Sequence, residues 1–289
     1  MPSLKDIRRR IGTVKNTQKI TRAMKLVAAA KLRRAQENIL KARPYAVELH
    51  EVISELAARA DAEDHPLLEQ REPRRVMMVI LTSDRGLCGA FNTNILRAAE
   101  KHYREHKDKH EVFQLAVVGR KGRDYLRYRG IEVDRYFPGL DVGTALERAK
   151  EISDAILEDY LDDSLDKVWL FYNEFKSAMS QQIITEQLLP IRPMELPEGH
   201  EAAIDFVYEP SKREILDTIM PMYVEVEVYR AALESTASEF GARMTAMENA
   251  TQNASEMIST LTLEYNKARQ AAITKELLEI VSGAEALKG

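Results

Sequence analysis

Two very long helical patterns, one at each end of the chain, restrict the possible fold more than any other feature. From Ser3 to about Ala60, small and apolar residues recur in steps of three and four, the spacing of a narrow heptad-like seam. A second pattern of this kind begins at Ser211 and continues to the end of the chain. At about 1.5 Å per residue these helices would extend roughly 80 Å and 110 Å, far more than a globular core requires.

Each seam is mostly aliphatic, with a few polar positions that predict only moderate stability for the helix pair alone. The first seam comprises Leu4, Ile7, Ile11, Val14, Gln18, Thr21, Met24, Ala28, Leu32, Ala35, Ile39 and Ala42. The second begins with Ile215, Ile219, Met222, Val226, Tyr229, Leu233, Thr236, Phe240, Met244 and Met247. Ser3 with Asp6, and Ser211 with Glu214, have the spacing of helix-capping boxes. Pro44 and Pro221 predict kinks.

The distribution of charge suggests how the two helices pair. Residues 1–45 carry thirteen Lys or Arg against two acidic residues, although the whole chain has a net charge of −4. Residues 211–289 carry eight basic and twelve acidic residues. A basic helix and an acidic helix should attract each other, and the chain has to return to its start. We therefore expect an antiparallel two-helix coiled coil formed by the two termini.

The middle of the chain, 74–209, has a different pattern and predicts a Rossmann-like α/β domain. Strands are expected at 75–82, 113–118, 131–137 and 167–172, with extended segments at 181–189 and 204–208. Helices are expected at about 92–105, 122–128 and 143–160. This alternation favours a mostly parallel sheet with helices on its faces. The predicted organisation is 1–60 for the first coiled-coil helix, 74–209 for the α/β domain and 211–289 for the second helix.

Several classes of protein are disfavoured by the composition. No apolar stretch approaches the roughly 18 residues that a membrane span needs, and the residues from Met1 to Lys5 lack the apolar core of a signal peptide. A single cysteine, Cys88, cannot form an intrachain disulfide and fits a reducing compartment. The six histidines show no ligand spacing, so no metal is expected.

The loop from Ser83 to Asn92 is the most site-like stretch because it follows a strand and precedes a helix. A phosphate-binding loop would lie there, but neither glycine-rich fingerprint is present. The favoured interpretation is a tight turn in which Gly86 and Gly89 adopt unusual φ angles. Cys88 could be a nucleophile near a helix N-terminus, but a small buried structural residue is favoured.

Three charged or apolar segments leave alternatives open. The stretch 119–123 could meet phosphate, and the acidic run 158–163 could suggest calcium, but solvated turns and helix ends are favoured. The basic first helix could bind nucleic acid, although an acidic protein partner is favoured. The apolar C-terminal end, including Ile273, should be enclosed by a partner or should fold back on its own domain.

Four motifs, distributed over the whole chain, resemble those of the γ, or central-stalk, subunits of F-type ATP synthases. They are residues 11–29 (IGTVKNTQKITRAMKLVAA), 82–89 (TSDRGLCG), 239–247 (EFGARMTAM) and 265–274 (YNKARQAAIT). Their order and spacing match the family. The two-cysteine regulatory insert of the photosynthetic branch is absent from this sequence, so a bacterial type without thiol regulation is expected.

The resemblance implies a rotor shaft with no catalytic residues and no cofactor of its own. The terminal helices would stand inside a hexamer of α and β subunits, and the middle domain would contact the ε subunit and the membrane c-ring. The expected location is the cytoplasmic face of the bacterial inner membrane, peripheral to it, with no nucleic acid bound. Carried over by motif, the expected hexamer interface comprises Lys19, Arg22, Met24, Arg243, Arg269, Gln270, Leu277, Ile280 and Val281.

Overall fold

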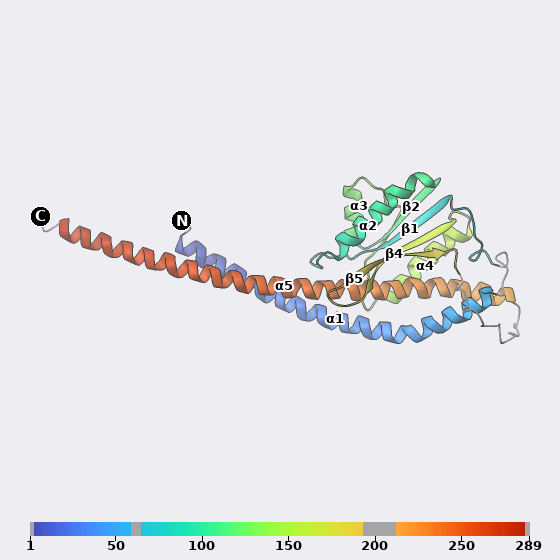
Figure 1. Cartoon of the computed structure of the whole chain (residues 1–289), viewed down its shortest axis with the longest axis horizontal. Coiled ribbons are helices and arrows are strands. Elements are labelled where there is room, and N and C mark those ends of the chain that lie inside the picture. Colours follow the sequence, from blue (N-terminus) through green and yellow to red (C-terminus); the bar gives the residue numbers. More distant parts are fainter. Residues whose placement is uncertain (1–2, 59–64, 193–211, 287–289) are drawn as a thin grey trace. The chain divides into compact units, whose positions relative to one another are not determined.

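The computed structural model describes residues 3–58, 65–192 and 212–286, which form two compact units (Figure 1). The first, called here the two-helix unit, comprises residues 1–27 and 244–289. The second, called the sheet unit, comprises residues 28–243. Two helices contribute to both units: α1 (Leu4–Ala58) and α5 (Lys212–Ala286).

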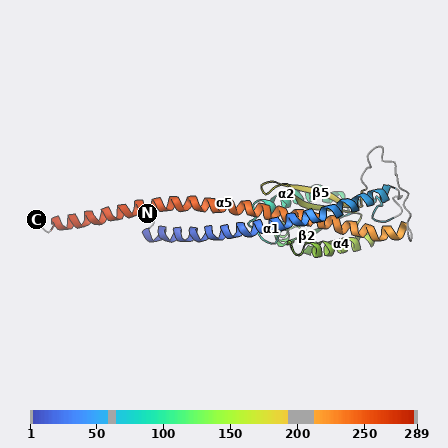
Figure 2. The same cartoon turned by 90° about the horizontal axis from the view of Figure 1, so that it is seen from below.

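In the two-helix unit, α1 and α5 lie side by side and run antiparallel, as the sequence predicts (Figure 2). The hydroxyl groups of Thr21 and Thr251 are 2.8 Å apart, and the ammonium group of Lys25 pairs with Glu248. The predicted cap of α1 is also confirmed, because the Ser3 hydroxyl oxygen accepts from the backbone N–H of Asp6 at 3.2 Å and the Asp6 carboxylate accepts from the backbone N–H of Ser3 at 3.3 Å.

The predicted seam of α1 faces the interior, but the predicted charge attraction between the helices is small. Ile7, Thr21, Ala28, Leu32 and Ala35 are buried, and no position of the predicted seam up to Ala42 is exposed. Both helices continue through their internal prolines. Among the described residues, Lys25–Glu248 is the ion pair that joins α1 to α5, so apolar packing rather than charge holds the two helices together.

The sheet unit contains a five-stranded sheet with the order β3-β2-β1-β4-β5. Its strands are β1 (Arg75–Leu81), β2 (Val112–Val118), β3 (Arg135–Phe137), β4 (Lys167–Phe175) and β5 (Gln181–Leu189). The first four are parallel, with Val79 paired to Ala116 on one side and to Leu170 on the other. Only β5 is antiparallel, so the prediction of a mostly parallel sheet is confirmed.

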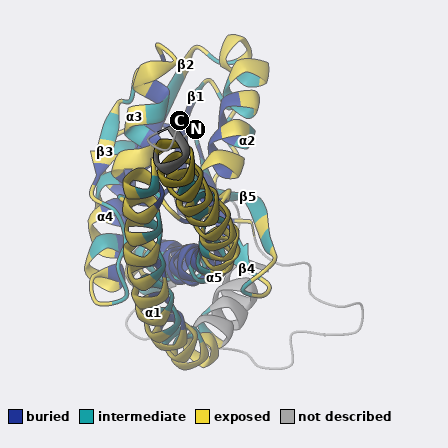
Figure 3. Ribbon diagram, turned by 90° about the vertical axis from the view of Figure 1, so that its left-hand side faces the viewer, coloured by how far each residue is buried: buried dark blue, intermediate teal, exposed yellow. Residues whose placement is uncertain are grey.

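Helices cover both faces of this sheet, as β1 alternates its side chains between two cores (Figure 1). Met78 and Ile80 pack toward α2 (Phe91–His106) and α3 (Arg120–Tyr128). Met77, Val79 and Leu81 pack on the other face, toward α4 (Ala145–Leu161) and the first half of α5. A short 3₁₀ helix (Lys107–Lys109) follows α2. Burial on both faces explains the uninterrupted apolar sequence of β1 (Figure 3).

Two strand boundaries differ from the sequence prediction. The predicted strand 131–137 is regular only over Arg135–Phe137. Gly130 has a φ of +68° and Ile131 is buried beside α3, so the chain first closes the α3 core and joins the sheet later. The strand β4 is longer than predicted and continues to Phe175. The predicted extended segment 204–208 lies outside the described residues.

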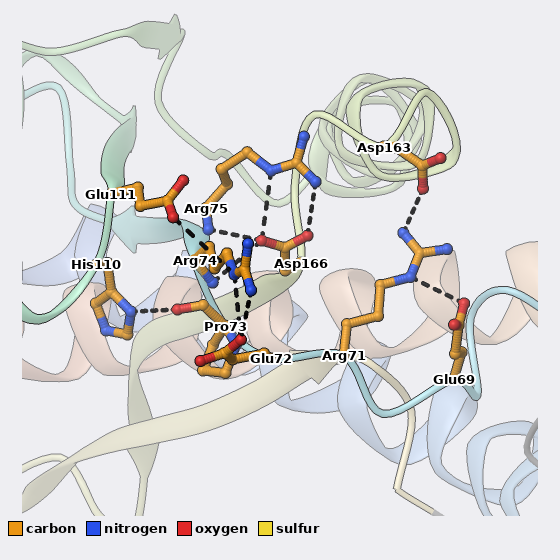
Figure 4. A network of polar contacts seen from close by, with 10 residues as sticks. All are labelled: Glu69, Arg71, Glu72, Pro73, Arg74, Arg75, His110, Glu111, Asp163 and Asp166. Atoms are coloured by element: carbon orange, nitrogen blue, oxygen red, sulfur yellow. Dashed lines mark hydrogen bonds and ion pairs between the residues drawn. The ribbon is translucent and has the colours of Figure 1, made fainter.

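The amino edge of the sheet carries a network of ion pairs (Figure 4). Asp166 accepts hydrogen bonds from the guanidinium and the backbone N–H of Arg75, at 2.9 Å and 2.7 Å. Arg71 pairs with Glu69 at 2.9 Å and with Asp163 at 2.6 Å. The remaining members are Glu72, Pro73, Arg74, His110 and Glu111. Because these charges satisfy one another, the network ties the segment before β1 to the sheet.

Candidate functional site

The loop between β1 and α2 lies at the place where an α/β sheet usually binds its ligand. From β1 the chain crosses to β2 on one side, whereas β4 lies on the other side. In such sheets the crevice at the carboxyl ends of these strands is the common ligand site. The geometry of residues 82–92 therefore tests the nucleotide-binding alternative.

The polar groups of this loop are used within the chain. The Asn92 side chain accepts from the backbone N–H of Ser83 at 3.0 Å and donates to its hydroxyl at 2.7 Å. The Asp84 carboxylate accepts from the backbone N–H groups of Arg120 and Gly139, at 2.9 Å and 3.2 Å. A Cβ atom at Gly139 would lie 2.7 Å from the Asp84 carboxyl carbon, so a larger residue there would displace this carboxylate. Three loops at the carboxyl edge are thus joined together.

The turn differs in one detail from the prediction. Gly89 has a positive φ of 57°, as expected, but the second left-handed residue is Leu87, with a φ of 64°, and not Gly86. Leu87 is exposed, so its side chain meets no steric conflict with a core. The positive φ of Leu87 nevertheless strains the backbone, at a cost on the order of 1 kcal/mol for a non-glycine residue.

The helix α5 meets this loop through a buried charge pair. The guanidinium of Arg243 donates to the carbonyl oxygens of Gly86 and Arg85, at 2.6 Å and 3.5 Å, and also pairs with the Glu239 carboxylate. Burial raises the pKa of Glu239, and the charge of Arg243 offsets part of this effect. The loop thus presents carbonyl oxygens to α5, whereas a phosphate site needs N–H donors. This arrangement supports the structural interpretation of the loop.

Cys88 is a buried residue of this loop, which confirms the favoured interpretation. The Asn92 amide donates to its sulfur at 3.2 Å. Burial raises the pKa of the thiol, and the nearby Glu239 carboxylate raises it further. A nucleophilic cysteine needs the opposite shift.

The two-helix unit displays a basic surface on α1. Lys19 and Arg22 are exposed, and Met24 is half-buried. Eight Lys or Arg residues lie between Lys5 and Lys25, and of these Lys25 is the one whose side chain forms an ion pair with another described residue. The other seven cations leave this surface strongly positive.

A groove of about 600 Å³ lies between α1 and α5 in the same unit. Arg9, Arg10 and Asp6 contribute charge to its lining, and Met257 and Leu261 contribute apolar surface. Val14 and Thr13 complete the lining. This groove was not predicted from the sequence, because it depends on which turns of the two helices face each other. Its lining thus combines two arginines and one carboxylate with apolar side chains.

The last turns of α5 expose the other residues that the motifs suggested. Arg269 and Gln270 are exposed. Leu277, Ile280 and Val281 have exposed fractions of 58%, 67% and 58%, so the described chain does not cover them. Arg243 differs from all of these residues, because it is buried against its own loop in the sheet unit.

The described residues include no helix that is long and apolar enough to cross a bilayer. In that same part of the chain, no three His, Cys, Asp or Glu side chains are grouped so that they could hold a metal ion.

Comparison with known proteins gives a consistent result over the full length. A family model described as ATP synthase matches residues 3–287. ATP synthase gamma chains of Anaeromyxobacter sp. (strain Fw109-5) and Geobacter metallireducens are 55% and 50% identical, and each alignment covers 100% of both chains.

Two solved structures have a similar fold. One is a chain of the Euglena gracilis mitochondrial ATP synthase (OSCP/F1/c-ring, rotational state 3), with a TM-score of 0.70, 23% identity and coverage of 98% of this chain and 94% of that one. The other belongs to the central stalk/c-ring of the Tetrahymena thermophila enzyme, with a TM-score of 0.57, 27% identity and coverage of 80% and 99%. By its sequence and its fold, this chain belongs to the ATP synthase gamma chain family.

Proposed function

We propose that this chain is the rotor shaft of a proton-translocating F-type ATP synthase, a non-catalytic subunit that couples c-ring rotation to ATP synthesis and hydrolysis at the β subunits. The observation that carries this proposal is the full-length identity of 50–55% to gamma chains. Its partners would be the hexamer of α and β subunits, the ε subunit and the c-ring. Its place would be the cytoplasmic face of the bacterial inner membrane, peripheral to the bilayer.

The surface of the two-helix unit supports a hexamer as the partner. Seven cations on α1 form no ion pair with another described residue and would attract acidic groups, and the groove beside Arg9 and Arg10 would accept an acidic loop. A shaft can shift the states of surrounding catalytic sites only if it binds them unequally. Charge and apolar surface that lie on particular turns of the helices meet this requirement.

The end of α5 supports the same partner. Leu277, Ile280 and Val281 would turn in an apolar sleeve, which removes their exposed surface from water. About two turns before Leu277, Arg269 and Gln270 would bind polar loops of the hexamer, while Lys19, Arg22 and Met24 would contact it from α1. A charge-assisted contact of Arg269 is stronger than a neutral one.

The proposal is tested by reconstituting the purified chain with isolated α and β subunits and measuring ATP hydrolysis. The expected result is that the chain alone is inert and that it restores multisite turnover to the mixture. ATP hydrolysis by the chain alone, or failure to join the hexamer, would overturn the proposal. Salt-sensitive binding to DNA together with no binding to the hexamer would support the nucleic-acid alternative instead.

The interface residues are tested with two double variants in membranes that contain the assembled enzyme. The variant Arg269→Ala, Gln270→Ala should weaken proton-driven ATP synthesis. The control Lys150→Ala, Asp154→Ala removes an exposed base and an exposed acid from α4 and should leave synthesis unchanged. Equal synthesis by both variants, at equal amounts of assembled enzyme, would refute the role of Arg269 and Gln270.

A further inference from the structure

One stretch of α5 is buried on all sides although it is rich in polar residues. Every residue from Ala231 to Arg243 except Glu234 is buried. The buried polar members are Ser235, Thr236, Ser238, Glu239 and Arg243. A buried helix usually has apolar residues all around. The burial of these polar groups costs free energy unless they form hydrogen bonds, so their partners indicate what they do.

Polar side chains in this stretch and just before it bind the sheet unit. The Glu234 carboxylate accepts from the backbone N–H of Phe175 at 2.9 Å. The Ser238 hydroxyl donates to the carbonyl oxygen of Asn173 at 3.0 Å. One turn before Glu234, Arg230 donates to the Glu186 carboxylate on β5 at 2.7 Å. Together these contacts attach one face of α5 to β4 and β5.

A glycine allows this face to approach the sheet closely. Gly241 lies about two turns after Glu234 on the same side of α5. A Cβ atom at Gly241 would be 3.0 Å from the Phe175 ring and 3.2 Å from the Ala178 Cα atom. The backbone of α5 therefore rests directly on the β4–β5 hairpin.

A second set of contacts holds the opposite face of the helix. Glu239 and Arg243 lie roughly 100° to 180° away from Glu234 and Ser238 around the helix axis. Arg243 donates to the carbonyl oxygen of Gly86, in the loop after β1, at 2.6 Å. The helix is thus held by directional contacts from two sides.

Directional contacts and apolar contacts resist different movements. Apolar burial is non-directional and mainly resists removal of the helix from the core, whereas a hydrogen bond to a fixed backbone atom specifies one register. We infer that Glu234, Ser238 and the Glu239–Arg243 pair fix the rotational register of α5 against the sheet, so that torque passes between the sheet unit and this helix without slippage. These residues, called here the register contacts, would position the shaft.

This inference rests on the proposed function, since a register lock matters only in a rotor. It also assigns Arg243 a different role from the one that the motif suggested. If the chain did not assemble with a hexamer at all, the wild type itself would fail in the experiment below. Failure of the proposed function is therefore distinguishable from failure of the register contacts.

The experiment measures torsional stiffness in the reconstituted complex. The hexamer is fixed to a surface and a bead is attached to the sheet unit through Lys109→Cys, an exposed position, while the native Cys88 is buried. The angular variance of the bead is recorded without nucleotide. The double variant Glu234→Ala, Ser238→Ala should increase this variance about twofold or more, because a compliant joint is added in series with the helix.

Two further variants separate register from ordinary stability. Glu234→Gln keeps an acceptor oxygen for the Phe175 N–H, so the bead on this single variant should show the wild-type angular variance. Val228→Ala removes buried apolar surface from the same helix and should lower the melting temperature without a change in variance. If the double variant does not fold, Ser238→Ala alone, which deletes one oxygen atom, serves the same measurement. An assembled register variant with wild-type variance, or an equal increase in Val228→Ala, would overturn the inference.

Discussion

Replacement of Arg243 by methionine should destabilise the sheet unit strongly. Arg243 and Glu239 are 8% and 7% exposed, and the guanidinium also binds the carbonyl oxygen of Gly86 at 2.6 Å. Methionine preserves much of the apolar stem but leaves the Glu239 carboxylate buried without a partner. Removing one member of a buried ion pair costs about 3–5 kcal/mol. We expect the free energy of unfolding of Arg243→Met to fall by about this amount at neutral or alkaline pH.

The size of this loss should depend on pH in a defined direction. Burial already raises the pKa of Glu239, and removal of Arg243 should raise it further. An acid whose pKa is higher in the folded state than in the unfolded state favours folding when it is protonated, so stability decreases as the pH rises through the folded pKa. The loss in Arg243→Met should therefore shrink on acidification, by at most about 1.4 kcal/mol per pH unit.

Urea unfolding, followed by the fluorescence of Trp169, measures these free energies within the sheet unit. This chain has one tryptophan, and it lies on β4. The double variant Glu239→Leu, Arg243→Met should recover to within about 1 kcal/mol of the wild type, because no charge is left buried. The control Arg33→Met breaks an exposed pair with Glu37 at the same spacing and should cost less than about 0.5 kcal/mol. A double variant as unstable as Arg243→Met would refute the argument from buried charge.

Three other substitutions give independent predictions. His102 is packed against Trp169, with ring centroids 5.2 Å apart, and burial, followed by the charge of His106, lowers its pKa to about 4. Because the unfolded state binds the proton more readily, stability should fall between about pH 6.5 and pH 4, by roughly 1–2 kcal/mol after solvent screening, and His102→Phe should abolish this fall in urea titrations. Gly241→Ala gains helix propensity but pushes on the β4–β5 hairpin, so a net loss of about 1 kcal/mol is expected from calorimetry. Asp166→Asn removes the carboxylate that binds Arg75 and should lower the urea midpoint at pH 7 more than at pH 3. Burial opposes ionisation of Asp166, but its hydrogen bonds outweigh that effect and lower its pKa, so its contribution is present at neutral pH and lost on acidification.

The parts of the fold that repeat over many residues could be predicted from the sequence. The heptad-like spacing of α1 continues from Leu4 to Ala42 and predicts a paired helix. The unbroken apolar run of β1 predicts a strand that is buried on both faces. Local features are harder to locate. The left-handed conformation fell on Leu87 rather than on Gly86, because the hydrogen bonds around Asp84 and Ser83 set the path of the turn.

The candidate site could be predicted only in part, because spacing does not reveal burial. Glu239–Arg243 and Arg33–Glu37 are both charge pairs four residues apart on a helix. The first pair has side chains about 10% exposed, whereas the side chain of Arg33 is 83% exposed. Which of the two pairs is buried depends on where the sheet and its loops pack, and the spacing along the helix does not reveal this. For this reason the motif alone placed Arg243 on a partner surface.

The seam of α5 is an incomplete guide at the place where the helix has two neighbours. Met222, at a predicted seam position, is exposed although its sulfur accepts from the Tyr45 hydroxyl of α1 at 3.0 Å, whereas the adjacent Tyr223 and Val224 are buried against the sheet. From Ala231 to Arg243, nearly every side chain of α5 is buried, so no boundary between a buried and an exposed face marks an apolar stripe. Small and polar residues fill this stretch, and their hydrogen bonds define one register. Sequence patterns that predict structure elsewhere are violated mainly at functional sites. Here the function is to keep α5 in one rotational register against the sheet unit.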